Sequence, residues 1–160
     1  MTMRAATVHE IKQELTGRKP AELVALCLRL SRFKKENKEL LTYLLFEAHD
    51  EAGYIENVKQ EMDALFEEIN ISHLYFVKKS LRKILRVVSK HVRYMGSKQA
   101  EAELLLHFCA KLKASGIPFE KSQVILNLYN QQLKKLYAAI GELHEDIQYD
   151  LRKQIDNVLM

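Results

Sequence analysis

Residues 55–95 decide the fold, and they read IENVKQEMDALFEEINISHLYFVKKSLRKILRVVSKHVRYM. When residues are placed at 100° steps, the apolar side chains of residues 55–69 fall on one arc and those of residues 74–95 fall on another. The tripeptide Asn70-Ile71-Ser72 separates the two arcs. The stretch therefore predicts two amphipathic helices joined by a short turn, with Ser72 as a suitable N-cap and Gly96 as a suitable C-terminal stop.

The two predicted helices carry opposite charge. Residues 36–68 contain ten acidic residues and two lysines, for a net charge of −8. Residues 69–98 contain eight basic residues and no acidic residue, for a net charge of +8. We therefore expect an antiparallel hairpin whose apolar stripes face inward and whose acidic and basic flanks face each other.

The rest of the chain also favours helices, because five glycines and two prolines in 160 residues are few. Start signals for four further helices lie at Thr7, Pro20, Asn37 and Ser97. Ser115-Gly116-Ile117-Pro118 is the clearest break, and residues 119–159 form either one kinked helix or two. We predict a single all-α domain over residues 1–160 with seven or eight mostly antiparallel helices. It is either a short α-solenoid of the HEAT-like kind or an irregular helical bundle.

The sequence predicts which residues lie in the core, among them two leucines and both cysteines. The segment 39–48 is apolar around most of its circumference, so we expect it at the centre of the core. Truncating Leu44 or Leu105 to alanine is therefore expected to cost about 2–5 kcal/mol. Cys27 and Cys109 lie in apolar runs and are expected to be buried, reduced thiols rather than a disulfide or a reactive site.

Composition and motifs exclude several classes of protein. No run of about 18 uncharged apolar residues exists, which excludes a membrane span. The first residues, MTMR, lead into polar sequence without the apolar region of a signal peptide, so we expect a cytoplasmic protein. The sequence has no CxxC motif, Gly-rich phosphate loop, dinucleotide fingerprint or serine-nucleophile motif. We predict no cofactor, and no set of residues points to an enzyme.

Several runs resemble a known family. The runs ELVALCLRL (residues 22–30) and KENKELLTYLLFEAHDE (residues 35–51) resemble a family of uncharacterised bacterial all-helical proteins. SLRKIL (residues 80–85) and KASGIPF (residues 113–119) resemble later parts of the same family. The resemblance spans most of the chain and implies an all-helical bacterial protein. It implies no activity, cofactor or partner.

The basic face of the second predicted helix is the strongest candidate site. Lysine and arginine on one helix face can bind phosphates and release counterions, and an aromatic ring among them can stack on a base. The alternative is that this face is solvated, or is neutralised by the acidic helix beside it. The residues of this candidate anion or nucleic-acid face are Tyr75, Lys78, Lys79, Arg82, Lys83, Arg86, Lys90 and Arg93.

A weaker candidate consists of the triplets His49-Asp50-Glu51 and His144-Glu145-Asp146, each with an imidazole beside two carboxylates. They could form a metal site only if the fold brought them together, because adjacent helical residues point about 100° apart. We therefore expect polar helix-end or loop residues and no metal ligand. The favoured function is a non-enzymatic module that binds an unknown protein partner. The alternatives are a nucleic-acid or polyanion binder that uses the basic helix 72–95, and a metal-dependent enzyme.

Overall fold

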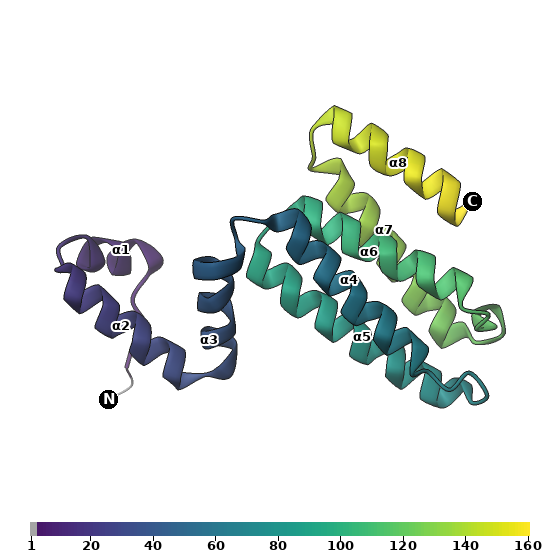
Figure 1. The fold of residues 1–160 in the computed structure, drawn as a ribbon, viewed down its shortest axis with the longest axis horizontal. Coiled ribbons are helices and arrows are strands. Elements are labelled where there is room, and N and C mark those ends of the chain that lie inside the picture. The colour runs from purple at the N-terminus through teal and green to yellow at the C-terminus, as the bar shows by residue number, and fades with distance from the viewer. Residues whose placement is uncertain (1–2) are drawn as a thin grey trace. The chain divides into compact units, whose positions relative to one another are not determined.

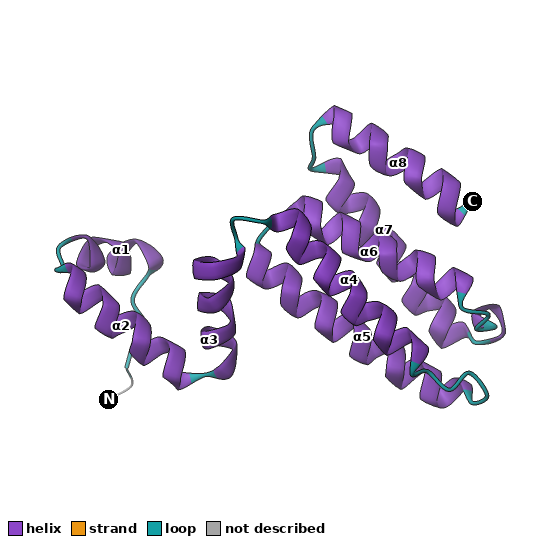
Figure 2. Ribbon diagram, viewed as in Figure 1, coloured by secondary structure: helices purple, strands orange, loops and turns teal. Residues whose placement is uncertain are grey.

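The computed structural model describes residues 3–160, which form eight α-helices and two shorter helical segments. Within this range no residue lies in a strand, so the all-α prediction is confirmed, as is the predicted number of helices (Figure 2). The chain divides into two compact units. We call Met1–Leu45 the N-terminal unit and Phe46–Met160 the C-terminal unit.

The N-terminal unit contains three helices, α1 (Val8–Thr16), α2 (Pro20–Phe33) and α3 (Lys35–Thr42). A π-helical turn, η1 (Tyr43–Glu47), continues α3 across the boundary between the units. The Thr7 hydroxyl accepts a 3.2 Å hydrogen bond from the Glu10 amide, as the capping signal predicts. Pro20 occupies the first turn of α2, and α2 packs against α3.

The start of α3 differs from the prediction. The helix begins at Lys35, so Asn37 lies inside it and is not its cap. The side-chain amide of Asn37 instead donates a 2.8 Å hydrogen bond to the carbonyl oxygen of Leu30. This carbonyl belongs to the last turn of α2, where backbone oxygens lack helical partners. The bond therefore fixes the corner between α2 and α3.

The C-terminal unit contains α4 (Glu51–Glu67), α5 (Leu74–Met95), α6 (Lys98–Ala114), η2 (Phe119–Lys121), α7 (Gln123–Gly141) and α8 (Glu145–Leu159). Helices α4 and α5 form the predicted hairpin and lie side by side in Figure 1. Residues 119–159 form two α-helices, because α7 ends at Gly141 and α8 starts after a short connection.

The caps of α5 are partly as predicted. Gly96 ends the helix in the left-handed conformation, with φ of 57°, which a residue with a side chain adopts only with strain. Ser72 is not the N-cap; His73 holds that position without a side-chain cap bond. The Ser72 hydroxyl and amide both donate hydrogen bonds to the Asn70 side-chain oxygen, at 2.6 and 3.0 Å, so Ser72 stabilises the turn instead.

The core lies in the C-terminal unit and is built around α6. This helix contacts α4, α5, α7 and α8, and Leu105 and Cys109 are buried in it as predicted. One central helix surrounded by the others is a bundle, whereas in a solenoid each repeat contacts only its neighbours. The HEAT-like alternative therefore has no support from this packing.

The prediction that residues 39–48 form the centre of the core is wrong. Tyr43 is buried, but Leu44, Leu45 and Phe46 are 56%, 64% and 66% exposed. An apolar sequence shows that a segment needs covering, and it does not show which part of the molecule covers it. In the described part of the chain, no other element covers these three side chains.

Candidate interaction surfaces

The basic face of α5 is exposed to solvent. Lys79, Arg82, Lys83, Arg86 and Arg93 are exposed, while Lys78 and Lys90 are half-buried. The ring of Tyr75 lies beside the first of these cations, because Lys79 Nζ is 4.8 Å from its centroid. Tyr75 is itself 61% exposed, so the predicted site residues share one accessible face.

Most cations of this face form no ion pair with the acidic helix in the range 3–160. At the contact between α4 and α5, His91 Nε2 lies 3.2 Å from Glu61 and His91 Nδ1 lies 2.7 Å from the Tyr54 hydroxyl. Six cations of α5 form no ion pair with any residue of the range 3–160. They are Lys78, Lys79, Arg82, Lys83, Arg86 and Arg93.

Two acidic residues in the C-terminal unit, Asp63 and Glu103, have shifted pKa values. Asp63 lies 2.6 Å from His107 Nε2 and 3.4 Å from Lys111 Nζ, across the α4–α6 contact. Burial acts to raise the pKa of Asp63, but the hydrogen bonds and charges of His107 and Lys111 lower it below its usual value. The pKa of Glu103 is raised, chiefly by burial. Burial and the neighbouring side chains account for the shifted pKa of each carboxylate.

The two His-containing triplets cap helices. The Asp50 carboxylate accepts a 3.0 Å hydrogen bond from the Gly53 amide at the start of α4. His144 Nδ1 accepts a 3.2 Å hydrogen bond from the Asp146 amide at the start of α8. Among residues 3–160, no three His, Cys, Asp or Glu side chains are arranged to hold a metal ion. Each triplet thus has a local role that needs no metal.

A second surface, in the N-terminal unit, was not predicted. No side chain of α1, α2 or α3 is buried, although these helices are rich in leucine. We call the exposed large side chains of α2 and of the segment after α3 the N-terminal apolar surface. They are Val24, Leu26, Leu28, Leu30, Phe33, Leu44 and Leu45, each between 42% and 76% exposed.

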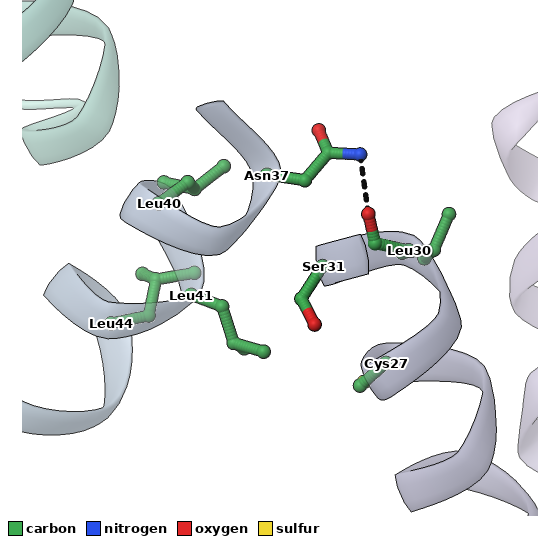
Figure 3. A pocket seen from close by; sticks show the side chains of 7 residues that line it. All are labelled: Cys27, Leu30, Ser31, Asn37, Leu40, Leu41 and Leu44. Carbon is green, nitrogen blue, oxygen red and sulfur yellow. Dashed lines mark hydrogen bonds between the residues drawn. The ribbon is translucent and has the colours of Figure 1, made fainter. Parts of the chain in front are cut away.

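A groove lies within this surface, between α2 and α3 (Figure 3). Its volume is ≈ 190 Å³, and the Asn37–Leu30 hydrogen bond crosses one end. The lining residues are Cys27, Leu30, Ser31, Asn37, Leu40, Leu41 and Leu44. Cys27 is free, as predicted, but it is exposed, so the prediction that it is buried is wrong.

A sequence signal for this surface exists in α2. Leu23, Cys27 and Leu30 form the expected stripe, but Val24 and Leu28 extend apolar character well around the helix. A helix that is apolar over such a wide arc needs covering on more than one side. Helix α3 packs against one side of α2, α1 lines a groove with Leu26, and Val24 and Leu28 on the opposite side of α2 stay exposed.

Comparisons with protein-family models, with curated proteins and with solved structures each find no match to this chain. The resemblance to a bacterial all-helical family therefore stays a prediction. Along residues 3–160, no helix combines the length and the apolar character needed to cross a membrane.

Proposed function

We propose that this chain is a non-enzymatic protein-interaction module of the bacterial cytoplasm, and that its N-terminal apolar surface contacts the partner. The observation that carries the proposal is the contrast between the two units. The C-terminal unit has a continuous buried core, whereas the three α-helices of the N-terminal unit bury no side chain. Many exposed large apolar side chains on a unit whose helices bury none are typical of an interaction site in soluble proteins.

The side chains of the surface suit a protein contact. Phe33 is 76% exposed, and aromatic residues dominate the binding energy of many interfaces. Phe33 and Leu30 together line a second hollow on α2, and Leu30 also lines the groove between α2 and α3. Removal of this apolar area from water contributes about 25 cal/mol per Å² to association. A folded partner or a second helix pair could supply the missing cover.

A photo-crosslinker placed at Phe33 tests the proposal. Benzoylphenylalanine replaces Phe33 in one variant and Tyr149 of α8 in a matched control, in the cells that make the protein. The two positions are similarly exposed, at 76% and 67%. We expect crosslinking to one defined protein from position 33 only, lost when Leu30→Glu is added. No crosslink at position 33, or the same products from both positions, would contradict the proposal.

Polyanion binding by α5 is a second candidate, favoured by the six cations that have no ion-pair partner among residues 3–160. Lysines and arginines in a row release counterions when they bind phosphates, so binding weakens as salt rises. Tyr75, beside Lys79, offers a ring on which a nucleic-acid base could stack. The face consists of exposed and half-buried cations along one helix, which favours weak binding without sequence preference.

A charge-reversal pair tests this candidate against duplex DNA. With three or four phosphate contacts, log affinity should fall against log salt with a slope of about −3 to −4. Lys79→Glu with Lys83→Glu should abolish the binding. The control is Lys134→Glu with Lys135→Glu, two exposed lysines of α7. If the control loses as much affinity as the α5 variant, binding is not specific to the α5 face and the candidate fails.

A further inference from the structure

We infer that the exposed aromatic rings at the start of α5 and the cations that follow them bind a single strand of nucleic acid. Unpaired bases stack on the rings, and the phosphate backbone lies along the cations. The inference rests on the second candidate function, polyanion binding by α5, and names the class of polyanion.

Three exposed rings lie together at the start of α5. Between centroids, the ring of Tyr75 is 5.5 Å from that of Phe76, and the ring of Phe76 is 6.0 Å from that of His73. Tyr75 and Phe76 are 61% and 53% exposed, and His73 is exposed as well. Within the range 3–160, neither Tyr75 nor Phe76 packs on the hydrophobic core of the bundle. The rings are therefore accessible to a planar ligand such as a base.

The cations begin where the rings end. Lys79 lies about one helical turn after Tyr75, and its Nζ is 4.8 Å from the centroid of that ring. Lys83 and Arg93 continue the same face and are exposed. At 1.5 Å per residue, the row from Tyr75 to Arg93 is about 27 Å long. Residues 69–98 contain no acidic residue, so no carboxylate of this segment repels a phosphate backbone.

The combination of rings and cations favours a single strand over a duplex. In a duplex the bases stack on each other, and a side chain that enters between them must first unstack them. The bases of a single strand can stack on aromatic side chains directly, and every base has a face suited to this. The cations attract either form of nucleic acid, whereas the rings add affinity only for unpaired bases.

An anionic membrane would also attract these cations, but α5 is poorly placed to bind one. A helix that lies on a membrane inserts its apolar face among the lipids. The apolar face of α5 is buried in the bundle, at Val77, Leu81 and Ile84. The packing of α5 therefore favours nucleic acid over a lipid surface.

Fluorescence anisotropy of the full chain with labelled probes of about 15 nucleotides tests the inference. The probes are an oligo-dT strand, an oligo-rU strand and a mixed-sequence DNA duplex of the same length. We expect at least one strand to bind at least about tenfold more tightly than the duplex at low salt. Its log affinity should fall against log salt with a slope of about −2 to −3, for three or four phosphate contacts. Tighter binding of one strand than the other identifies DNA or RNA as the source of the ligand.

Two variants of the rings separate stacking from charge. Tyr75→Ala with Phe76→Ala should weaken binding of the strand at least about tenfold and binding of the duplex less than about twofold. Tyr75→Phe keeps the ring and should keep the affinity. Tyr149→Ala, at a position of α8 that is 67% exposed, is the control and should change neither affinity. Circular dichroism verifies that each variant keeps its helices.

Three results would overturn the inference. Equal affinity for strand and duplex, or strand binding that the double alanine variant leaves unchanged, refutes the single-strand site and leaves polyanion binding by α5 standing. Binding to vesicles of equal parts phosphatidylcholine and phosphatidylglycerol, without binding to either strand, assigns the face to a lipid surface instead. No binding to any of these probes refutes both the inference and the second candidate function.

Discussion

Cys27 and Cys109 show at the scale of single residues what a sequence pattern leaves open. Both lie in apolar helical runs, and both are predicted to be buried. Cys109 is fully buried in the bundle, and burial raises its pKa to about 12. Cys27 lines the groove between α2 and α3 and is exposed. The pattern identifies the apolar helix but cannot show whether a neighbouring element covers it.

The two thiols should therefore differ in reactivity. In dilute native protein, a thiol reagent should label Cys27 readily and Cys109 only after denaturation, because the thiolate is the reactive form and a buried thiol rarely ionises. Mass spectrometry of the labelled protein counts the modified sites. Labelling of both thiols in the native state, or of neither, would contradict these burial assignments.

The paired carboxylate of Asp63 gives a pH-dependent prediction. Its lowered pKa means that the ionised form stabilises the fold above the usual value of 3.8, and that this contribution is lost as the pH falls through the lowered pKa. Asp63→Asn should cost up to about 1 kcal/mol at neutral pH, since the pair is partly exposed. Its difference from wild type should shrink near pH 3.

Urea unfolding at pH 7 and near pH 3 measures this difference. Asp156→Asn serves as the control, because Asp156 is exposed on α8 and makes no ion pair with a described residue. An Asp63→Asn effect that is equal at both pH values would show that the carboxylate charge is not the cause.

At the scale of helices, local signals predicted some ends and missed others. Thr7 and Ser97 cap α1 and α6 as predicted, since each hydroxyl accepts a hydrogen bond from the amide three residues later. Asn37 and Ser72 have equally good capping side chains but bond elsewhere, to Leu30 and Asn70. A capping residue has several possible backbone partners, and tertiary packing selects among them.

The hairpin of α4 and α5 follows from periodicity, because a helix must bury its apolar stripe. The opposite charges of the two helices predicted the orientation of their flanks less well. Exposed ion pairs contribute only about 0.2–1 kcal/mol, so they do not dictate how two flanks are oriented. Six α5 cations have no acidic partner within the described range 3–160, and five of them are exposed. The predicted basic face is accessible, and its binding function stays a prediction.

Two leucines in different elements provide a matched stability test. Leu105 of α6 is 4% exposed, whereas Leu44 of η1 is 56% exposed. Leu105→Ala should cost about 2–5 kcal/mol, and Leu44→Ala should cost less than about 0.5 kcal/mol in the monomer. The sequence predicts the same loss of stability for both substitutions, and the exposure of Leu44 corrects that prediction for Leu44. Urea denaturation of dilute protein measures both, and equal losses would show that η1 is packed after all.

For the whole molecule, composition predicted an all-α fold but not its division into two units. The net charge illustrates why: the chain has a net charge of +4, all of it within residues 1–45, while residues 46–160 carry equal numbers of basic and acidic residues. No linker rich in glycine or proline marks the boundary, which falls inside η1. Whether the chain unfolds as the single predicted domain depends on what stabilises the N-terminal unit.

Amide hydrogen exchange of the full chain measures that stability directly, with α2 and α6 compared in dilute solution. In dilute solution, we expect slow exchange in α6, which is central to the bundle, and rapid exchange in α2, which buries no side chain. If α2 exchanges as slowly as α6 even in dilute solution, the N-terminal unit is stable without a partner and its apolar surface is not an interaction site.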